Sequence, residues 1–254
     1  MQFEKFSKGY AEIDGARLAY LERPAPGPVL ILIPGSFGTH EVYADVLPHL
    51  DPGIHLLFVN LRGHGESDPP PEDVSIEQFG ADVLSVADQA GVGDFYVGGH
   101  SIGGMVALEI GRISPERVLG IVSMEGWTRW QAQRDAFGGN QAPTLAPELA
   151  ERRMRNREEA TRGWTEEQVR EFARIWRRWD CYDFLKSTDL PILEMWGDRG
   201  REKPGIDRLY IPERENIRVA WLENSSHSIL LEAPEMVAGL VNEFVLQKGG
   251  LART

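Results

Sequence analysis

The chain has 254 residues, 42% of them hydrophobic, so it can bury a sizeable core in one or two domains. Its 39 acidic and 27 basic residues give a net charge of −12, which argues against nucleic acid and anionic membranes as partners. The single cysteine, Cys181, excludes an internal disulfide. The first ten residues lack the apolar core of a signal peptide. The longest apolar run, at 29–33, is too short to cross a bilayer, so we expect a cytoplasmic location.

Strand patterns begin near the N-terminus. The stretch GYAEIDGARLAYLE, at 9–22, alternates apolar and polar residues around Asp14-Gly15, which is a preferred hairpin turn, and therefore predicts an antiparallel hairpin. Continuous apolar, β-rich runs follow, of the kind typical of strands buried on both faces of a mainly parallel sheet. These runs lie at 29–33, 55–60, 94–99, 117–124, 191–197 and 217–223.

Helical patterns fall between the strand patterns, with apolar stripes within 76–90, 105–111 and 236–245. The alternation predicts crossover connections and an open α/β sheet flanked by helices.

The stretch 127–189 breaks this alternation, because it carries five of the seven tryptophans and no strand pattern. Thr165 and Gln168 have the spacing of a capping box, which predicts that a helix begins there. We therefore expect 127–189 to be a helical cap, or lid, inserted into one core domain made of 1–126 and 190–254. The natural place for such a cap is over one end of the sheet.

The sequence Gly99-His100-Ser101-Ile102-Gly103 fits the pattern G-x-S-x-G. It stands directly after a predicted strand and directly before a predicted helix, where a sharp turn would expose the serine hydroxyl above the sheet. The flanking glycines remove the side chains that would collide in such a turn. The pattern therefore predicts that Ser101 is a nucleophile at a helix N-terminus, where backbone N–H groups favour developing negative charge.

Four segments together resemble the α/β-hydrolase superfamily, in the order expected of it. They are LIPGSFG at 32–38, LRGHGESD at 61–68, GHSIGG at 99–104 and NSSHSILLEAPE at 224–235. The resemblance implies an α/β-hydrolase fold with Ser101 at the nucleophile elbow. It also implies that the last of these loops carries the catalytic histidine.

A serine hydroxyl needs a base within hydrogen-bond reach. Of the six histidines, His227 alone follows a late strand pattern and precedes the closing amphipathic helix, where this topology requires its base. We therefore expect His227 to be the catalytic base.

The acid of the triad has two candidates. In most of the superfamily it follows a few residues after the strand at 191–197, but that position is Gly200 here, and Asp198 stands two residues earlier. Glu125 ends the strand RVLGIVSM, and this segment resembles a branch of the haloalkane dehalogenases that places its acid there. We favour Glu125 and keep Asp198 as the alternative.

The oxyanion of an acyl-transfer intermediate needs two hydrogen-bond donors. The resemblance implies that the backbone N–H groups of Ile102 and Ser36 supply them, with Phe37 as a weaker alternative to Ser36. Trp127 and Trp130 follow Glu125 closely in sequence, so we expect them, with Phe37, to line the substrate pocket. The arginines of 152–157 could attract an anionic substrate, although a run of arginines is more often a solvated face.

Serine in place of the dehalogenase carboxylate indicates acyl transfer. We therefore expect a hydrolase that acts on a small carboxylic ester or lactone through an acyl-enzyme. The sequence lacks the phosphate-binding loop, the zinc-protease helix motif and paired Cys/His spacings, so we expect neither a cofactor nor a metal. Two alternatives are a carbon–carbon bond hydrolase or lyase on the same fold, and a non-catalytic homologue that binds a small ligand.

Overall fold

The computed structural model describes residues 3–13, 15–70, 72–138 and 145–246. Within these residues, eight strands form one sheet in the order β1-β2-β4-β3-β5-β6-β7-β8. The strands are β1 (Ser7–Ile13), β2 (Ala16–Arg23), β3 (Val29–Ile33), β4 (His55–Val59), β5 (Phe95–His100), β6 (Val118–Met124), β7 (Ile192–Gly197) and β8 (Ile217–Leu222). The predicted α/β fold is confirmed, since each apolar run has become a strand from β3 to β8.

Strands β3 to β8 are parallel to one another, and β2 joins β4 antiparallel. The predicted hairpin is present as the antiparallel pair β1 and β2. Gly15 at its turn has a φ of 75°, a conformation that glycine adopts without strain, whereas Asp14 lies outside the described residues. The segments that follow β3, β5, β6, β7 and β8 all leave from the same edge of the sheet.

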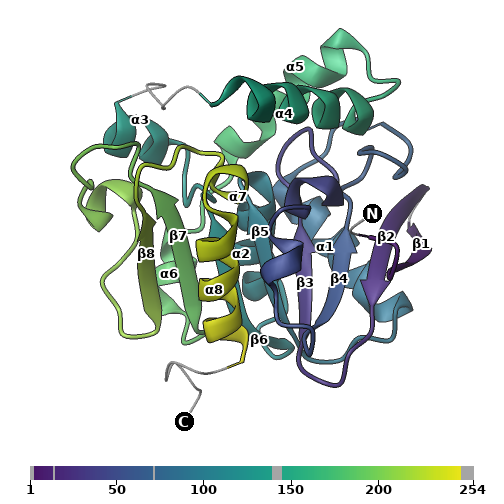
Figure 1. Ribbon diagram of the computed structural model, residues 1–254, viewed down its shortest axis with the longest axis horizontal. Coiled ribbons are helices and arrows are strands. Elements are labelled where there is room, and N and C mark those ends of the chain that lie inside the picture. The colour runs from purple at the N-terminus through teal and green to yellow at the C-terminus, as the bar shows by residue number, and fades with distance from the viewer. Residues whose placement is uncertain (1–2, 14, 71, 139–144, 247–254) are drawn as a thin grey trace.

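Helices cover both faces of the sheet, with α8 in front and α1 and α2 behind in the view of Figure 1. The core helices are α1 (Ile76–Gln89), α2 (Ile102–Ile113), α7 (Ile229–Glu232) and α8 (Pro234–Val245), and the short 3-10 helices outside 127–189 are η1 (His40–Tyr43), η2 (Leu47–His49) and η4 (Ile206–Leu209). Each face has its own cluster of buried apolar side chains, one centred on α1 and α2 and the other on α8. None of the helices in the described part of the chain is long and apolar enough to cross a membrane.

The chain between β6 and β7 is helical where the structure describes it. It contains α3 (Gln131–Phe137), α4 (Pro147–Ala160), α5 (Glu166–Ile175), η3 (Trp176–Arg178) and α6 (Tyr182–Ser187). The predicted capping box is present at the start of α5, where Thr165 and Gln168 each accept a hydrogen bond from the other's backbone N–H. Figure 1 shows α4 and α5 above the edge of the sheet at which the parallel strands end. Phe172 and Trp179 join the same apolar cluster as α1 and α2, so this region packs against the sheet.

Ser101 is the single residue between the end of β5 and the start of α2, and backbone atoms without intervening side chains pack closely on both sides of this turn. A Cβ atom on Gly99 would lie 2.2 Å from the carbonyl oxygen of Gly103. A Cβ atom on Gly103 would lie 2.3 Å from the carbonyl oxygen of Ile33, at the end of β3. Both contacts are with backbone, which cannot swing aside, so glycine is required at 99 and 103 for α2 to approach the sheet this closely.

We predict that Gly103→Ala lowers the free energy of unfolding by at least about 2 kcal/mol, because the added methyl group overpacks a backbone contact. Gly239→Ala is the matched control, since it lies within α8 with no atom within 4 Å of the added Cβ. There the same change should stabilise by about 0.5–1 kcal/mol through helix propensity. Urea denaturation measures both values, and an unchanged midpoint for Gly103→Ala would contradict the packing argument.

Candidate active site

Ser101 occupies a strained turn at the carboxyl end of β5. Its φ of 55° and ψ of −120° lie outside the regions that non-glycine residues normally adopt. Its backbone N–H donates to the carbonyl oxygen of Met124, the last residue of β6, over 2.8 Å. The half-buried serine therefore stands at the N-terminus of α2, fixed by the neighbouring strand.

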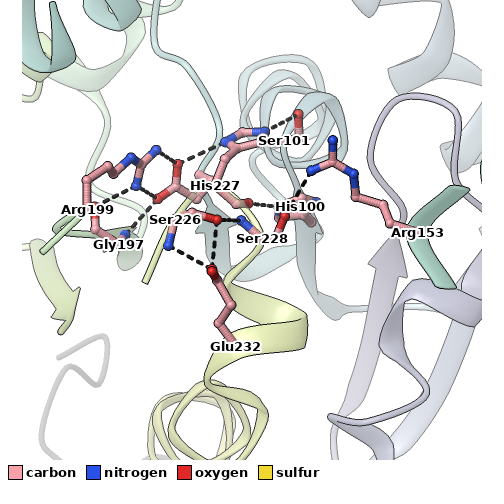
Figure 2. Close-up of polar contacts among 10 residues, drawn as sticks. His100, Ser101, Arg153, Gly197, Arg199, Ser226, His227, Ser228 and Glu232 are labelled. Atoms are coloured by element: carbon pink, nitrogen blue, oxygen red, sulfur yellow. Dashed lines mark hydrogen bonds and ion pairs between the residues drawn. The ribbon is translucent and has the colours of Figure 1, made fainter. Parts of the chain in front are cut away.

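A chain of hydrogen bonds runs from Ser101 through His227 to Glu125. Figure 2 shows the imidazole of His227 directed at the hydroxyl of Ser101. The distance from Ser101 Oγ to His227 Nε2 is 3.0 Å, and from His227 Nδ1 to Glu125 Oε2 it is 2.9 Å. Glu125 is fully buried at the end of β6, and His227 lies in the loop between β8 and α7. The structure thus brings together three residues that are widely separated in sequence.

Glu125 is held by more than the histidine. Arg199, in the loop after β7, makes a two-pronged ion pair with it, and the backbone N–H of Gly197 donates to Oε1 over 2.6 Å. Burial opposes ionisation of Glu125, but the hydrogen bonds from Arg199 and His227 outweigh it, so the pKa of Glu125 lies below its ordinary value. The carboxylate is therefore ionised at neutral pH despite its burial.

The ionised Glu125 determines the tautomer of His227. A carboxylate can only accept hydrogen bonds, so Nδ1 of His227 must carry the hydrogen in that contact. The neutral imidazole then has a lone pair at Nε2, directed at the hydroxyl of Ser101. This is the arrangement in which a histidine can take the serine proton.

Asp198, the alternative acid, does not contact His227. Its Oδ1 accepts the backbone N–H of Gly200 over 2.8 Å and that of Asn224 over 2.7 Å, so the carboxylate ties together the loops after β7 and β8. Of the two candidates, the structure places only Glu125 against the histidine. The cation that balances Glu125, Arg199, was not identified from the sequence.

Two further contacts that the sequence did not reveal hold the loop of His227 in place. The Nε2 of His100 hydrogen-bonds to the carbonyl oxygen of His227 over 2.7 Å, and burial lowers the pKa of His100 to about 4, so this ring is neutral. Glu232 in α7 accepts the backbone N–H of Ser226 over 2.7 Å and its hydroxyl over 2.8 Å (Figure 2). The backbone on both sides of the imidazole is thus anchored.

The loop after β3 lies against Ser101, since a Cβ atom on Gly35 would be 3.3 Å from Cβ of Ser101. Phe37 already donates its backbone N–H to Nε2 of His64 over 3.2 Å, and burial lowers the pKa of His64 to about 4, which keeps this nitrogen an acceptor. In the described part of the chain, no hydrogen bond from the backbone N–H of Ser36 or Ile102 is found. The backbone N–H of Ser36 is thus available to donate to a bound group, whereas that of Phe37 is engaged.

A cavity of about 600 Å³ opens onto Ser101 and His227. Phe37 lines it, as expected, together with residues of the loop after β3, of η1, α4 and α7. Trp127 and Trp130 do not, which corrects the expectation drawn from their closeness to Glu125 in sequence. Trp127 is buried, with its ring stacked on that of His227 at 5.9 Å, and Trp130 is 41% exposed on the surface under the guanidinium of Arg134. Across the described residues, no group of three or more His, Cys, Asp or Glu is placed to hold a metal ion.

The ion pair between Arg199 and Glu125 gives a prediction for stability against pH. A group whose pKa is lowered by folding stabilises the fold above its unfolded value, near 4.5, and loses that contribution as the pH falls through the folded value. We expect Arg199→Met to cost about 3–5 kcal/mol at pH 7, because it leaves a buried carboxylate without its cation. The difference from the wild type should shrink as the pH falls, because protonation of Glu125 in the variant removes the unpaired buried charge, and it should be smallest once Glu125 is protonated in the wild type as well.

Chemical denaturation from pH 7 to pH 3 measures this difference. Arg218→Met is the control, because its ion pair with Glu243 is more than a third exposed and should contribute less than about 1 kcal/mol. A loss in Arg199→Met as small as in Arg218→Met, or one that does not change with pH, would contradict the assigned role of the ion pair.

The chain is similar to known proteins in sequence and in fold. The profile of the alpha/beta hydrolase fold family matches residues 28–201, which is more than half of the chain. RutD of Escherichia coli O9:H4, named as a proposed carbamate hydrolase, is 32% identical over 109 residues, covering 42% of this chain and 41% of RutD. The chain thus spans less than half the length of that curated relative.

Two solved structures show the same fold over nearly the whole chain. A hydrolase from Pseudomonas aeruginosa PA01 has a TM-score of 0.76 at 24% identity, covering 95% of this chain and 98% of the other. The enol-lactonase from Burkholderia xenovorans LB400 has a TM-score of 0.75 at 20% identity, covering 94% of this chain and all of the other. Profile, topology and architecture agree, and the chain belongs to the alpha/beta hydrolase fold family.

Proposed function

We propose that this hydrolase is a serine hydrolase that cleaves a carboxylic ester or a lactone through an acyl-enzyme. The observation that carries the proposal is the unbroken hydrogen-bonded chain from Ser101 through His227 to the buried, ionised Glu125. A serine at the elbow supports attack on a carbonyl carbon. The names of two relatives, a lactonase and a proposed carbamate hydrolase, also describe substrates with a carbonyl carbon.

In the first half of the reaction, Ser101 Oγ attacks the carbonyl carbon while its proton passes to Nε2 of His227. The imidazolium that forms keeps its Nδ1–H on Glu125, whose negative charge stabilises it. The oxygen of the tetrahedral intermediate accepts hydrogen bonds from the backbone N–H groups of Ile102 and Ser36. Collapse of the intermediate breaks the bond to the leaving alkoxide, which takes the proton from His227, and an acyl-Ser101 ester remains.

The second half regenerates the enzyme. Water gives a proton to Nε2 of His227 and its oxygen attacks the acyl carbon. The new tetrahedral intermediate uses the same two N–H donors, and Ser101 leaves with the proton from His227. The products are a carboxylic acid and an alcohol, or a hydroxy acid where the substrate is a lactone. In this proposal residues 127–189 form the cap of the site and α4 contributes one wall of its cavity.

We predict that Ser101→Ala lowers kcat for a p-nitrophenyl ester at least about 10³-fold, and that Glu125→Gln lowers it by a similar factor, because the amide no longer stabilises the imidazolium. Asp198→Asn is the matched control. The amide oxygen can still accept the two backbone N–H groups, so its activity should stay within about threefold of the wild type.

Intact-protein mass after treatment with a fluorophosphonate gives a second readout of the same proposal. Wild type and Asp198→Asn should gain one phosphonyl group, whereas Ser101→Ala should gain none. Unlabelled wild-type protein, or cleavage of a 1,3-diketone without cleavage of any ester, would refute the proposal.

A further inference from the structure

Helix α4 places four arginines along the cavity: Arg152, Arg153, Arg155 and Arg157. Two of them are neutralised. Arg152 forms an ion pair with Asp45, and Arg155 forms one with Glu151 at 2.6 Å on its own helix. Among the described residues, neither Arg153 nor Arg157 has a carboxylate oxygen within ion-pair distance.

The two guanidinium groups without an ion pair line the same cavity as Ser101. Arg153 Nη1 donates to the hydroxyl of Ser228, next to the proposed base, over 3.2 Å (Figure 2). Cζ of Arg157 lies 4.3 Å from the centre of the ring of Phe37, which follows Ser36 in the loop after β3. Residues four apart on a helix share one face, so two like charges stand side by side, a destabilising arrangement that a bound anion would relieve.

Two carboxylates, Glu41 and Glu159, also line the cavity. Burial, together with the charge of Glu159, raises the pKa of Glu41, which indicates that these two acids repel each other. Neither lies within ion-pair distance of Arg153 or Arg157 in the described residues. The rest of the wall is largely apolar, with Phe37, Val42 and Leu230 among its members. The cavity thus combines an apolar body with two cations beside the reactive centre.

The position of α4 is fixed, which makes these cations part of a built site. Asn156 lies between Arg153 and Arg157 in sequence, and its Oδ1 accepts a hydrogen bond from the backbone N–H of Thr39 over 3.3 Å. At the end of the helix, the carbonyl oxygen of Ala160 accepts the backbone N–H of Gly65 over 2.8 Å. Both contacts join the helix to loops of the core, so the face that carries the two arginines is turned toward the cavity.

We propose that the substrate carries a carboxylate in addition to its scissile ester or lactone bond, and that Arg153 and Arg157 bind this group. The inference rests on the proposed serine hydrolase function and specifies its substrate class. A guanidinium offers paired N–H donors that match the two oxygens of a carboxylate. In a molecule with a net charge of −12, two unpaired cations at the mouth of the site also attract an anion that the rest of the surface repels.

The test compares esters of equal chain length that differ only in the terminal charge. The pairs are monoethyl glutarate with ethyl valerate, and monoethyl adipate with ethyl hexanoate, with acid release followed by titration. We expect kcat/KM of the wild type to be about tenfold higher for at least one carboxylate ester than for its neutral partner. This preference should decrease in 0.5 M NaCl, because both arginines are exposed enough for salt to screen them.

The variants Arg153→Gln and Arg157→Gln should each reduce the preference, and the double variant should bring the ratio of kcat/KM for the carboxylate ester to that for the neutral ester down to about one. Because the readout is this ratio, a change common to both rates cancels. Arg170→Gln is the control, since Arg170 also lies in 127–189, pairs with Glu166 on α5 and does not line the cavity. It should keep the full preference.

The outcomes separate the two proposals. Labelling of Ser101 by a fluorophosphonate together with equal or lower kcat/KM for both carboxylate esters would overturn the carboxylate site and leave the serine hydrolase intact. A preference that survives in the double variant would likewise overturn the assignment to Arg153 and Arg157. Failure of Ser101 to be labelled would remove the proposed function, and this inference with it.

Discussion

The site depends on the close approach of bare backbone around the turn from β5 into α2. Gly99 and Gly103 face each other there, and Gly103 also meets the carbonyl oxygen of Ile33, at distances that leave no space for a Cβ atom. A residue later, a Cβ atom on Gly104 would lie 3.0 Å from Cα of Gly126, beyond the end of β6. The N-terminus of α2 therefore fits between the ends of three strands, and the strained conformation of Ser101, which costs about 1–3 kcal/mol, is imposed by this packing.

The same packing explains how Glu125, which directly follows β6, comes within reach of His227. The backbone N–H of Ser101 donates to the carbonyl oxygen of Met124. Glu125 is the next residue after Met124, so its side chain begins close to Ser101. A carboxylate so deeply buried would lose its charge without partners. The end of β7 supplies the N–H of Gly197, and the loop after β7, in which the alternative acid Asp198 stands, supplies Arg199. The acid, Glu125, therefore stands at the end of β6, and its cation, Arg199, follows the end of the neighbouring strand β7.

Much of this could be predicted from the sequence because it depends on local pattern. Apolar runs predict buried parallel strands, and parallel strands bring their carboxyl ends to one edge, which places Ser101, Glu125 and the loop of His227 together. Arg199 could not be found in this way, since nothing local distinguishes a buried arginine from a surface one. A signal did exist. A carboxylate at the end of an inner strand needs a cation, and Arg199 stands at the end of the next strand.

The cavity beside Ser101 was the hardest part to predict from sequence patterns, because it depends on how separate elements pack together. Trp127 follows Glu125 closely in sequence, yet it packs on the ring of His227 and does not line the cavity. One wall of the cavity is formed by α4, which begins 20 residues after Trp127. The composition of α4 is that of a solvated helix, and only its contacts with the core turn one face toward Ser101.

Those contacts link the wall of the cavity to the loop after β3, which contains Ser36. Asn156 of α4 bonds to the backbone N–H and the hydroxyl of Thr39, three residues beyond Ser36. Arg157 packs on Phe37, whose own backbone is held by His64. The loop whose N–H group is proposed to bind the oxyanion is therefore held in part by the helix that lines the cavity. The wall of the cavity and the loop after β3 are therefore held by shared contacts, those of Asn156 with Thr39 and of Arg157 with Phe37.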